Sequence, residues 1–134
     1  MTVELAIVSR IVTDGEADEQ LLSLEGILRE EAKGFTLGYR DPEGDLTTLR
    51  LHPEEVRIRR SGIFSSAITV RPGTAEPFFY RTPYGALELI CIGEEILLER
   101  EGGSGRVQLR YHLDSPAGPV SENTIIISFK ECVK

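Results

Sequence analysis

The chain has 134 residues and a mass of 14.9 kDa, which is the size of one typical domain. Hydrophobic residues make up 40% of it and charged residues 28%, and these ordinary globular values argue against a disordered or fibrous chain. The net charge of −7 at pH 7 repels phosphate backbones and anionic membranes, so we expect neither nucleic acid nor a membrane surface as a general partner. We predict a single domain over residues 1–134.

The N-terminal residues and the cysteines predict a soluble, cytoplasmic protein. Glu4 stands where a secretion signal would carry a basic residue, and Arg10 interrupts the first apolar run. No apolar stretch approaches the roughly 20 residues that a membrane-spanning helix needs. Cys91 and Cys132 are too few for a disulfide framework, so we expect both thiols to be reduced. Cys91 stands between two isoleucines, which predicts a buried, unreactive thiol.

Apolar and polar residues alternate with a period of two along most of the chain, and this alternation predicts β-strands. Together with the turn residues between them, the alternating segments place strands at residues 3–12, 20–29, 34–40, 46–52, 55–60, 64–70, 77–82, 84–92, 95–99, 106–113 and 121–131, where adjacent pieces are free to merge. No helical crossover separates these strands. We therefore predict an all-β fold, a single antiparallel meander barrel of about eight to ten strands.

Residues 17–32 are the ambiguous segment. Their apolar residues also fall at helical spacing, namely Ala17, Leu21, Leu24, Leu28 and Ala32. Against a helix, Gly26 costs about 1 kcal/mol in a helix interior, while Leu22, Leu24 and Leu28 also fit one face of a strand. We predict a strand here, although periodicity alone leaves both structures open.

A particular order of residues appears from residue 60 onward: Arg60-Ser61-Gly62, Gly73, Tyr80-Arg81-Thr82-Pro83-Tyr84-Gly85, Gly105, Tyr111-His112-Leu113 and Asn123. In this order and spacing the chain resembles the YwiB-like family, small bacterial proteins of unknown function with a calycin-type, lipocalin-like β-barrel. The resemblance covers roughly residues 24–131. It implies that residues 21–28 form a strand and that the sheet closes, and it implies no activity.

The chain departs from its relatives at two points. It carries Ser65-Ser66-Ala67-Ile68 where YwiB-like proteins often place larger or amide side chains, so a polar constellation in the barrel interior need not be shared. Secreted lipocalins pack a tryptophan of the first strand under an arginine from a late strand. This chain has no tryptophan, and the resemblance to lipocalins therefore extends to the architecture without that closing device.

No residue pattern predicts catalysis, a cofactor or a metal site. The only histidines, His52 and His112, are far apart in sequence and have no second ligand at metal-binding spacing. No Gly-x-Ser-x-Gly elbow occurs, and the glycine-rich residues 102–105 join two predicted strands as a turn. Glu94 and Glu95 are adjacent in sequence, and adjacent strand residues face opposite sides unless a bulge realigns them.

The middle of this acidic chain is basic. Between residues 50 and 81 it carries six arginines against three glutamates. Arg57 and Arg59 share the outward register of their strand, whereas Arg60 falls in the inward register of Val56 and Ile58. We expect Arg60 either to sit at the barrel rim or to reach a carboxylate or a row of backbone carbonyls, because buried charges are normally paired. The alternative is that Arg60 anchors the anionic group of a ligand inside the barrel.

Aromatic residues in inward registers give the candidate ligand wall. With Arg60 as the cationic anchor, we place Tyr80 and Tyr111 as hydroxyl donors and Phe35, Tyr39 and Phe78 as apolar wall. The predicted function is binding of a small, partly apolar and in the sharper form anionic ligand. Two alternatives stand beside it: a filled barrel that serves protein–protein interaction or self-association, for example as a homodimer, and, as the third, an enzyme.

Overall fold

The computed structural model describes residues 1–132, and these residues form ten β-strands and no helix. The strands are β1 (Thr2–Thr13), β2 (Glu16–Glu31), β3 (Gly34–Arg40), β4 (Leu46–His52), β5 (Glu55–Ser61), β6 (Ser66–Val70), β7 (Ala75–Thr82), β8 (Gly85–Glu101), β9 (Ser104–Ser115) and β10 (Gly118–Glu131). All of them belong to one sheet in the order β6-β5-β4-β3-β2-β1-β10-β9-β8-β7.

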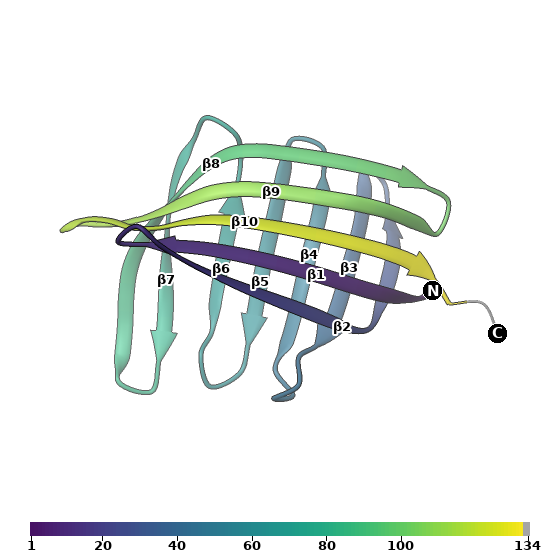
Figure 1. The fold of residues 1–134 in the computed structure, drawn as a ribbon, viewed down its shortest axis with the longest axis horizontal. Helices are drawn as coiled ribbons and strands as arrows, with labels where there is room; N and C mark the ends of the chain where they lie inside the picture. The colour runs from purple at the N-terminus through teal and green to yellow at the C-terminus, as the bar shows by residue number, and fades with distance from the viewer. Residues whose placement is uncertain (133–134) are drawn as a thin grey trace.

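Every ladder of this sheet is antiparallel, and the ten strands curl into a nearly closed barrel. In Figure 1, β1, β8, β9 and β10 lie across one side of the barrel, and β3 to β7 run steeply across them on the other side. Consecutive strands are adjacent in the sheet, with the single exception of β6 and β7, which stand at its two edges. In addition, the first strand, β1, pairs with the last, β10. The predicted all-β, antiparallel meander barrel is therefore confirmed.

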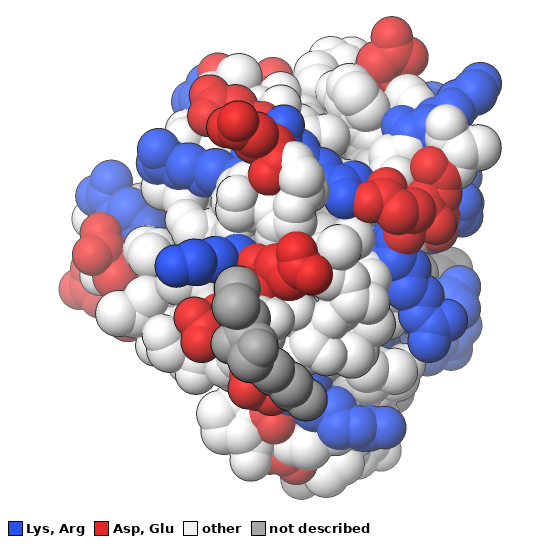
Figure 2. All heavy atoms as spheres, turned by 90° about the vertical axis from the view of Figure 1, so that its right-hand side faces the viewer, with Lys and Arg blue, Asp and Glu red and all other residues white. Residues whose placement is uncertain are grey.

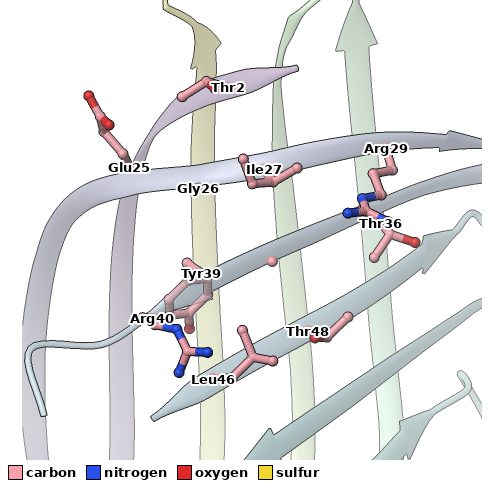
Figure 3. Close-up of a pocket in the computed structure, with 11 residues that line it drawn as sticks. Thr2, Glu25, Gly26, Ile27, Arg29, Thr36, Tyr39, Arg40, Leu46 and Thr48 are labelled. Carbon is pink, nitrogen blue, oxygen red and sulfur yellow. The ribbon is translucent and has the colours of Figure 1, made fainter. Parts of the chain in front are cut away.

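The ambiguous segment is a strand, β2, that turns the corner between the two sides. Its residues 16–27 pair with β1, and its residues 26–31 pair with β3. The strand curves near Glu25 and Gly26 (Figure 3). A Cβ atom at Gly26 would lie 2.6 Å from Leu5 Cδ1 and 2.7 Å from the Gly38 carbonyl oxygen. The glycine that weighed against a helix is thus required by the close packing at this corner.

The predicted strands at residues 84–92 and 95–99 are one strand, β8, interrupted by a β-bulge between Gly93 and Glu95. The two predicted pieces therefore merge, as the sequence allowed, because a bulge inserts an extra residue without ending the strand. Gly93 is buried, and the turn between β6 and β7 packs directly against it: Gly73 N donates to Gly93 O at 3.0 Å, and Gly93 N donates to Thr74 O at 3.1 Å.

The barrel interior is packed with hydrophobic side chains. Eighteen of them are buried, and those with no more than 2% exposure include Leu28, Leu37, Leu51, Leu109 and Ile127. The buried thiol of Cys91 belongs to this core, and burial raises its pKa to about 12. A neutral thiol at physiological pH agrees with the unreactive cysteine that the sequence predicts.

An arginine covers an aromatic ring at one end of the barrel. Phe35 packs against Phe129 with ring centroids 5.3 Å apart, and the Arg100 guanidinium lies 4.8 Å from the centre of the Phe35 ring. Arg100 also forms an ion pair with Glu30. At this end of the barrel, an arginine side chain thus covers the ring of a phenylalanine.

Figure 2 shows the side of the molecule that carries the chain termini, where acidic and basic side chains are interspersed. Within residues 1–132, no helix is long and apolar enough to cross a membrane.

Candidate functional site: the seam between β6 and β7

The barrel wall is incomplete where β6 meets β7, and we call this junction the seam. An isolated bridge joins the strands at one end, with Ser65 N donating to Arg81 O at 3.0 Å and Arg81 N donating to Ser65 O at 2.8 Å. At the other end, the β6–β7 turn is bonded to Gly93 of β8. No ladder joins β6 to β7 between these two attachments within the described chain.

A cleft of about 420 Å³, the seam cleft, opens at this junction. It is lined by Arg59, Arg60, Ser61, Ser65, Ser66, Ala67, Pro77, Phe78, Phe79 and Arg81. Successive residues of a strand face opposite sides of a sheet. Because both Arg59 and Arg60, and both Phe78 and Phe79, line the cleft, it is bordered by residues of both faces of the sheet on β5 and β7.

The charges in the seam cleft are all positive. Arg59, Arg60 and Arg81 line it together with no aspartate or glutamate. Across residues 1–132, none of the three forms an ion pair, and Arg81 instead lies 5.7 Å from the centre of the Phe79 ring. Of the two structural expectations, Arg60 fits the rim position, because it is exposed and reaches no carboxylate or backbone carbonyl among these residues. Arg60 needs no partner in the protein, because an exposed guanidinium at the rim stays hydrated.

The seam cleft also offers hydroxyl groups. Ser61, Ser65 and Ser66 line it, and their side chains make no hydrogen bond to another described residue. Ser66 is only 9% exposed. Hydroxyls without an internal partner are free to donate to the oxygen atoms of a ligand or of water.

Two of the predicted tyrosines, Tyr39 and Tyr111, stand on β3 and β9. Tyr111 is buried, and burial raises its pKa to about 12, while the positive charge of Arg60 acts in the opposite direction and Tyr39 adds a smaller upward effect. Tyr39 and Arg60 are the two cross-strand partners of Thr47 on β4, so they stand at the same level of the sheet. The Tyr111 hydroxyl makes no hydrogen bond to another residue among 1–132.

The remaining predicted residues lie in three different places. Phe78 is buried and lines the seam cleft. Tyr80 is half-buried and stacks on Phe64, with ring centroids 6.1 Å apart and an interplanar angle of 17°. Phe35 stands four residues before Tyr39 on β3, about 13 Å along the strand, and packs under Arg100 at the other end of the barrel. Phe35 is therefore not part of this site.

Arg81 and the three serines were not among the predicted site residues, and Arg59 was assigned only to the outer face. A sequence signal was available, because the resemblance rests partly on Arg60-Ser61-Gly62 and on Tyr80-Arg81-Thr82. Only the Ser65–Arg81 bridge, however, shows that these two segments meet across the seam.

A second hollow, of about 660 Å³, lies on the outer face of β2, β3 and β4 (Figure 3). Ile27 and Leu46 line it together with Arg29 and Arg40. A Cβ atom on Gly38 would meet no atom closer than 4.0 Å, so bare backbone forms part of the floor. The hollow is a surface trough with few polar side chains free to bind a charge, since Arg40 Nη1 already donates to the Gly44 carbonyl at 2.9 Å.

The β8 bulge realigns the adjacent glutamates, which is the exception that the sequence left open. Glu94 and Glu95 both contact Arg110, at 3.6 Å and 3.4 Å respectively. His112 Nε2 also contacts Glu94. The charges of these carboxylates thus face the Arg110 guanidinium.

Three carboxylates also approach one another in the β3–β4 turn, where oxygen atoms of Asp41, Glu43 and Asp45 lie within 4.8 Å. The backbone of the turn explains the position of Asp41, because its Oδ1 accepts the N–H groups of Glu43 at 2.9 Å and Asp45 at 3.0 Å. This is an Asx-type turn that stabilises the loop.

Comparisons with known proteins place the chain in a family. A model of the family described as "Domain of unknown function (DUF1934)" matches residues 5–127. The crystal structure of the ywiB protein from Bacillus subtilis superposes with a TM-score of 0.86 at 19% sequence identity, covering 98% of this chain and 92% of that chain. No curated protein matches the sequence. The resemblance to YwiB-like proteins is confirmed, and the chain belongs to the DUF1934 family, whose function is unknown.

Proposed function

We propose that the protein binds a small, partly apolar anion in the seam cleft. The observation that carries the proposal is the convergence of Arg59, Arg60 and Arg81 in a cleft that has no acidic side chain. The buried, reduced Cys91 and the similarity to a Bacillus protein support a bacterial, cytoplasmic binding protein. A relationship to the ligand-carrying calycin barrels is part of the same proposal.

The charge arrangement favours an anion because these arginines differ from most others in the chain. Six arginines have acidic partners in the described residues, namely Arg10, Arg50, Arg57, Arg71, Arg100 and Arg110. The three arginines of the seam cleft have none, in a protein whose net charge is −7. Grouped cations repel one another, and a bound anion relieves that repulsion while accepting the paired N–H groups of each guanidinium.

The apolar part of the ligand has a surface beside these charges. Pro77, Phe78 and Phe79 line the same cleft as the arginines. Ligand sites typically combine apolar walls with a few polar groups that fix orientation. Because aliphatic and aromatic side chains fill the barrel interior, the ligand occupies the opening in the wall and not the centre of the barrel.

A fluorescence titration with 1-anilinonaphthalene-8-sulfonate, an aromatic monoanion, tests this proposal. Arg60→Met removes the charge at similar length, and we expect its affinity for the probe to fall about tenfold, since a lost charge-assisted contact is worth about 1.4 kcal/mol or more. Arg60 is exposed and unpaired, so we expect its free energy of unfolding to change by less than about 0.5 kcal/mol.

The matched control is Arg106→Met, which removes an equally exposed arginine of β9 that does not line the seam cleft. It should leave the affinity for the probe within about twofold. Equal binding by the wild type and Arg60→Met, together with a lower melting temperature of the variant, would assign Arg60 a structural role and refute the proposal.

Nucleic acid remains outside the proposed ligands. Arg57 and Arg59 lie on the outer face of β5, but Arg57 is paired with Glu55 at 3.4 Å. An acidic protein whose outward Arg57 and Arg59 have no aromatic strip interleaved on β5 has little affinity for RNA at physiological salt.

Self-association is the second candidate function, and one apolar row on the outer face favours it. Leu21, Val8 and Ile126 are cross-strand neighbours on β2, β1 and β10, and Gln108 connects this row to Leu97 of β8. Leu21 is 68% exposed and Leu97 is 51% exposed. A second copy of the chain, carrying the same row, provides a complementary apolar surface for a twofold dimer.

Light scattering after size exclusion measures this second candidate. For a dimer built on the row, Leu21→Lys with Leu97→Lys should shift the mass from twice 14.9 kDa to 14.9 kDa, because charges placed in an apolar interface are left unpaired. Ile63→Lys, an exposed apolar residue outside the row, is the control and should keep the dimer. A wild-type protein that is monomeric at high micromolar concentration contradicts the candidate.

A further inference from the structure

The seam cleft holds more cationic and hydroxyl donors than a carboxylate can use. Arg59, Arg60 and Arg81 present three guanidinium groups, and each planar guanidinium matches two oxygen atoms of one anion. A carboxylate carries one negative charge, which a single guanidinium already balances. The surplus of donors indicates an anion with more oxygen atoms and more charge.

The hydroxyl groups strengthen this indication. Ser65 and Ser66 come from the residues that border the seam on the β6 side, and Ser61 ends β5. None of the three side chains is hydrogen-bonded to another residue of the described chain. Serine hydroxyls and arginines together are a usual set of donors for phosphate oxygens.

Two contacts hold the residues of the seam cleft in place. The backbone bridge between Ser65 and Arg81 fixes β6 against β7 at the cleft. The cation–π contact of 5.7 Å with Phe79 holds the Arg81 guanidinium beside it. In addition, Ser66 is only 9% exposed and its hydroxyl makes no hydrogen bond within residues 1–132; because no buried polar atom of these residues lacks a partner, this hydroxyl is open to solvent, and Ser66 lines the cleft.

From these groups we infer that the ligand of the seam cleft is a phosphate monoester of a compact apolar group, with its doubly charged phosphate held by Arg59, Arg60 and Arg81 and its apolar group against Phe78 and Phe79. The inference rests on the proposed function, because it specifies the anion that the same cleft binds. The phosphate offers three terminal oxygens and two charges to three cationic donors, which matches the arrangement better than any monoanion does.

Phenyl phosphate and phenyl sulfate provide the test, because they have the same shape and differ in charge. At pH 8 the phosphate is a dianion, since its second pKa is near 6, and the sulfate is a monoanion. In isothermal titration calorimetry at fixed ionic strength, we expect phenyl phosphate to bind at least tenfold more tightly than phenyl sulfate. Inorganic phosphate, which lacks the apolar group, should bind at least tenfold more weakly than phenyl phosphate.

Variants of Arg81 test whether the preference for phosphate arises in the seam cleft. They should not disturb the barrel, because this side chain is exposed. Arg81→Met should reduce the preference for phosphate over sulfate to less than threefold, and Arg81→Lys should keep part of it by retaining the charge. Arg106→Met, away from the cleft, should keep the preference of the wild type. Melting temperatures of all variants, measured in parallel, show that they are folded.

The outcomes separate this inference from the proposed function. Equal affinities for phenyl phosphate and phenyl sulfate, both weakened by Arg81→Met, would refute the phosphate monoester and leave an anion site in place. Inorganic phosphate that binds as tightly as phenyl phosphate would also overturn the inference, because the apolar group would then contribute nothing. Failure of all three anions to bind at millimolar concentration would refute both the inference and the proposed function.

Discussion

Gly93→Ala should lower the free energy of unfolding by about 3 kcal/mol and the melting temperature by about 10 °C. A Cβ atom at this position would lie 2.3 Å from the Arg71 carbonyl oxygen and 2.6 Å from its carbon. These are backbone atoms, so the β6–β7 turn must move away from β8. That movement breaks the hydrogen bonds of Gly93 with Gly73 and Thr74, each worth about 1 kcal/mol, and adds strain.

The same substitution should weaken anion binding, because the turn that it displaces is one of the two attachments of the seam. Urea denaturation measures the stability, and the anilinonaphthalene titration measures the binding. Gly38→Ala is the matched control: its Cβ would meet nothing closer than 4.0 Å, so stability should stay the same or rise by up to about 1 kcal/mol. A loss below about 1 kcal/mol for Gly93→Ala would show that the turn is not held by the bulge.

Leu109→Ala should cost about 3 kcal/mol, within the range of 2–5 kcal/mol that is typical of large-to-small changes in a packed core. Leu109 is 0% exposed and its side chain lies among those of the barrel interior, between Ile125 of β10 and Ile96 of β8. Removing three carbon atoms leaves a cavity that the closed wall cannot collapse to fill, and the lost contacts are not replaced by water.

Urea denaturation of Leu109→Ala and Leu97→Ala makes the comparison. Leu97 stands on the adjacent strand but is 51% exposed, so its truncation should cost less than about 0.5 kcal/mol. This pair decides between a filled and an open barrel. A cost below about 1 kcal/mol for Leu109→Ala would mean that space already surrounds this side chain, and the ligand would then be sought in the barrel centre instead of the seam.

Period-two alternation was sufficient to predict the architecture because it depends on the backbone alone. A strand with one buried face must alternate, and ten such strands without helical crossovers have few ways to bury those faces other than an antiparallel barrel. The alternation therefore located Leu37, Leu109 and Ile127 in the core, and the apolar neighbours of Cys91 predicted its burial. For residues 17–32, the resemblance agreed with the strand that periodicity had left ambiguous.

The site was predicted less completely, because register along one strand says nothing of distance to another. Of the predicted residues, Arg60 and Phe78 line the seam cleft, and both fall in the inward registers of their strands. Phe35 shares the inward register of Tyr39 but lies at the other end, beneath Arg100. Alternation gives the face on which a side chain lies and leaves its depth along the barrel axis undetermined.

By itself, the amino-acid sequence determined that this is an acidic, all-β chain with a period-two core, a buried Cys91 and a basic segment in its middle. Only the tertiary structure decided that Arg59, Arg60 and Arg81 meet in one cleft without acidic partners, because they come from β5 and β7, which the open seam brings together. The physical reason is that an ion pair forms only when two opposite charges come within about 4 Å of each other. Which side chains come that close is decided by the pairing of strands that are far apart in the chain.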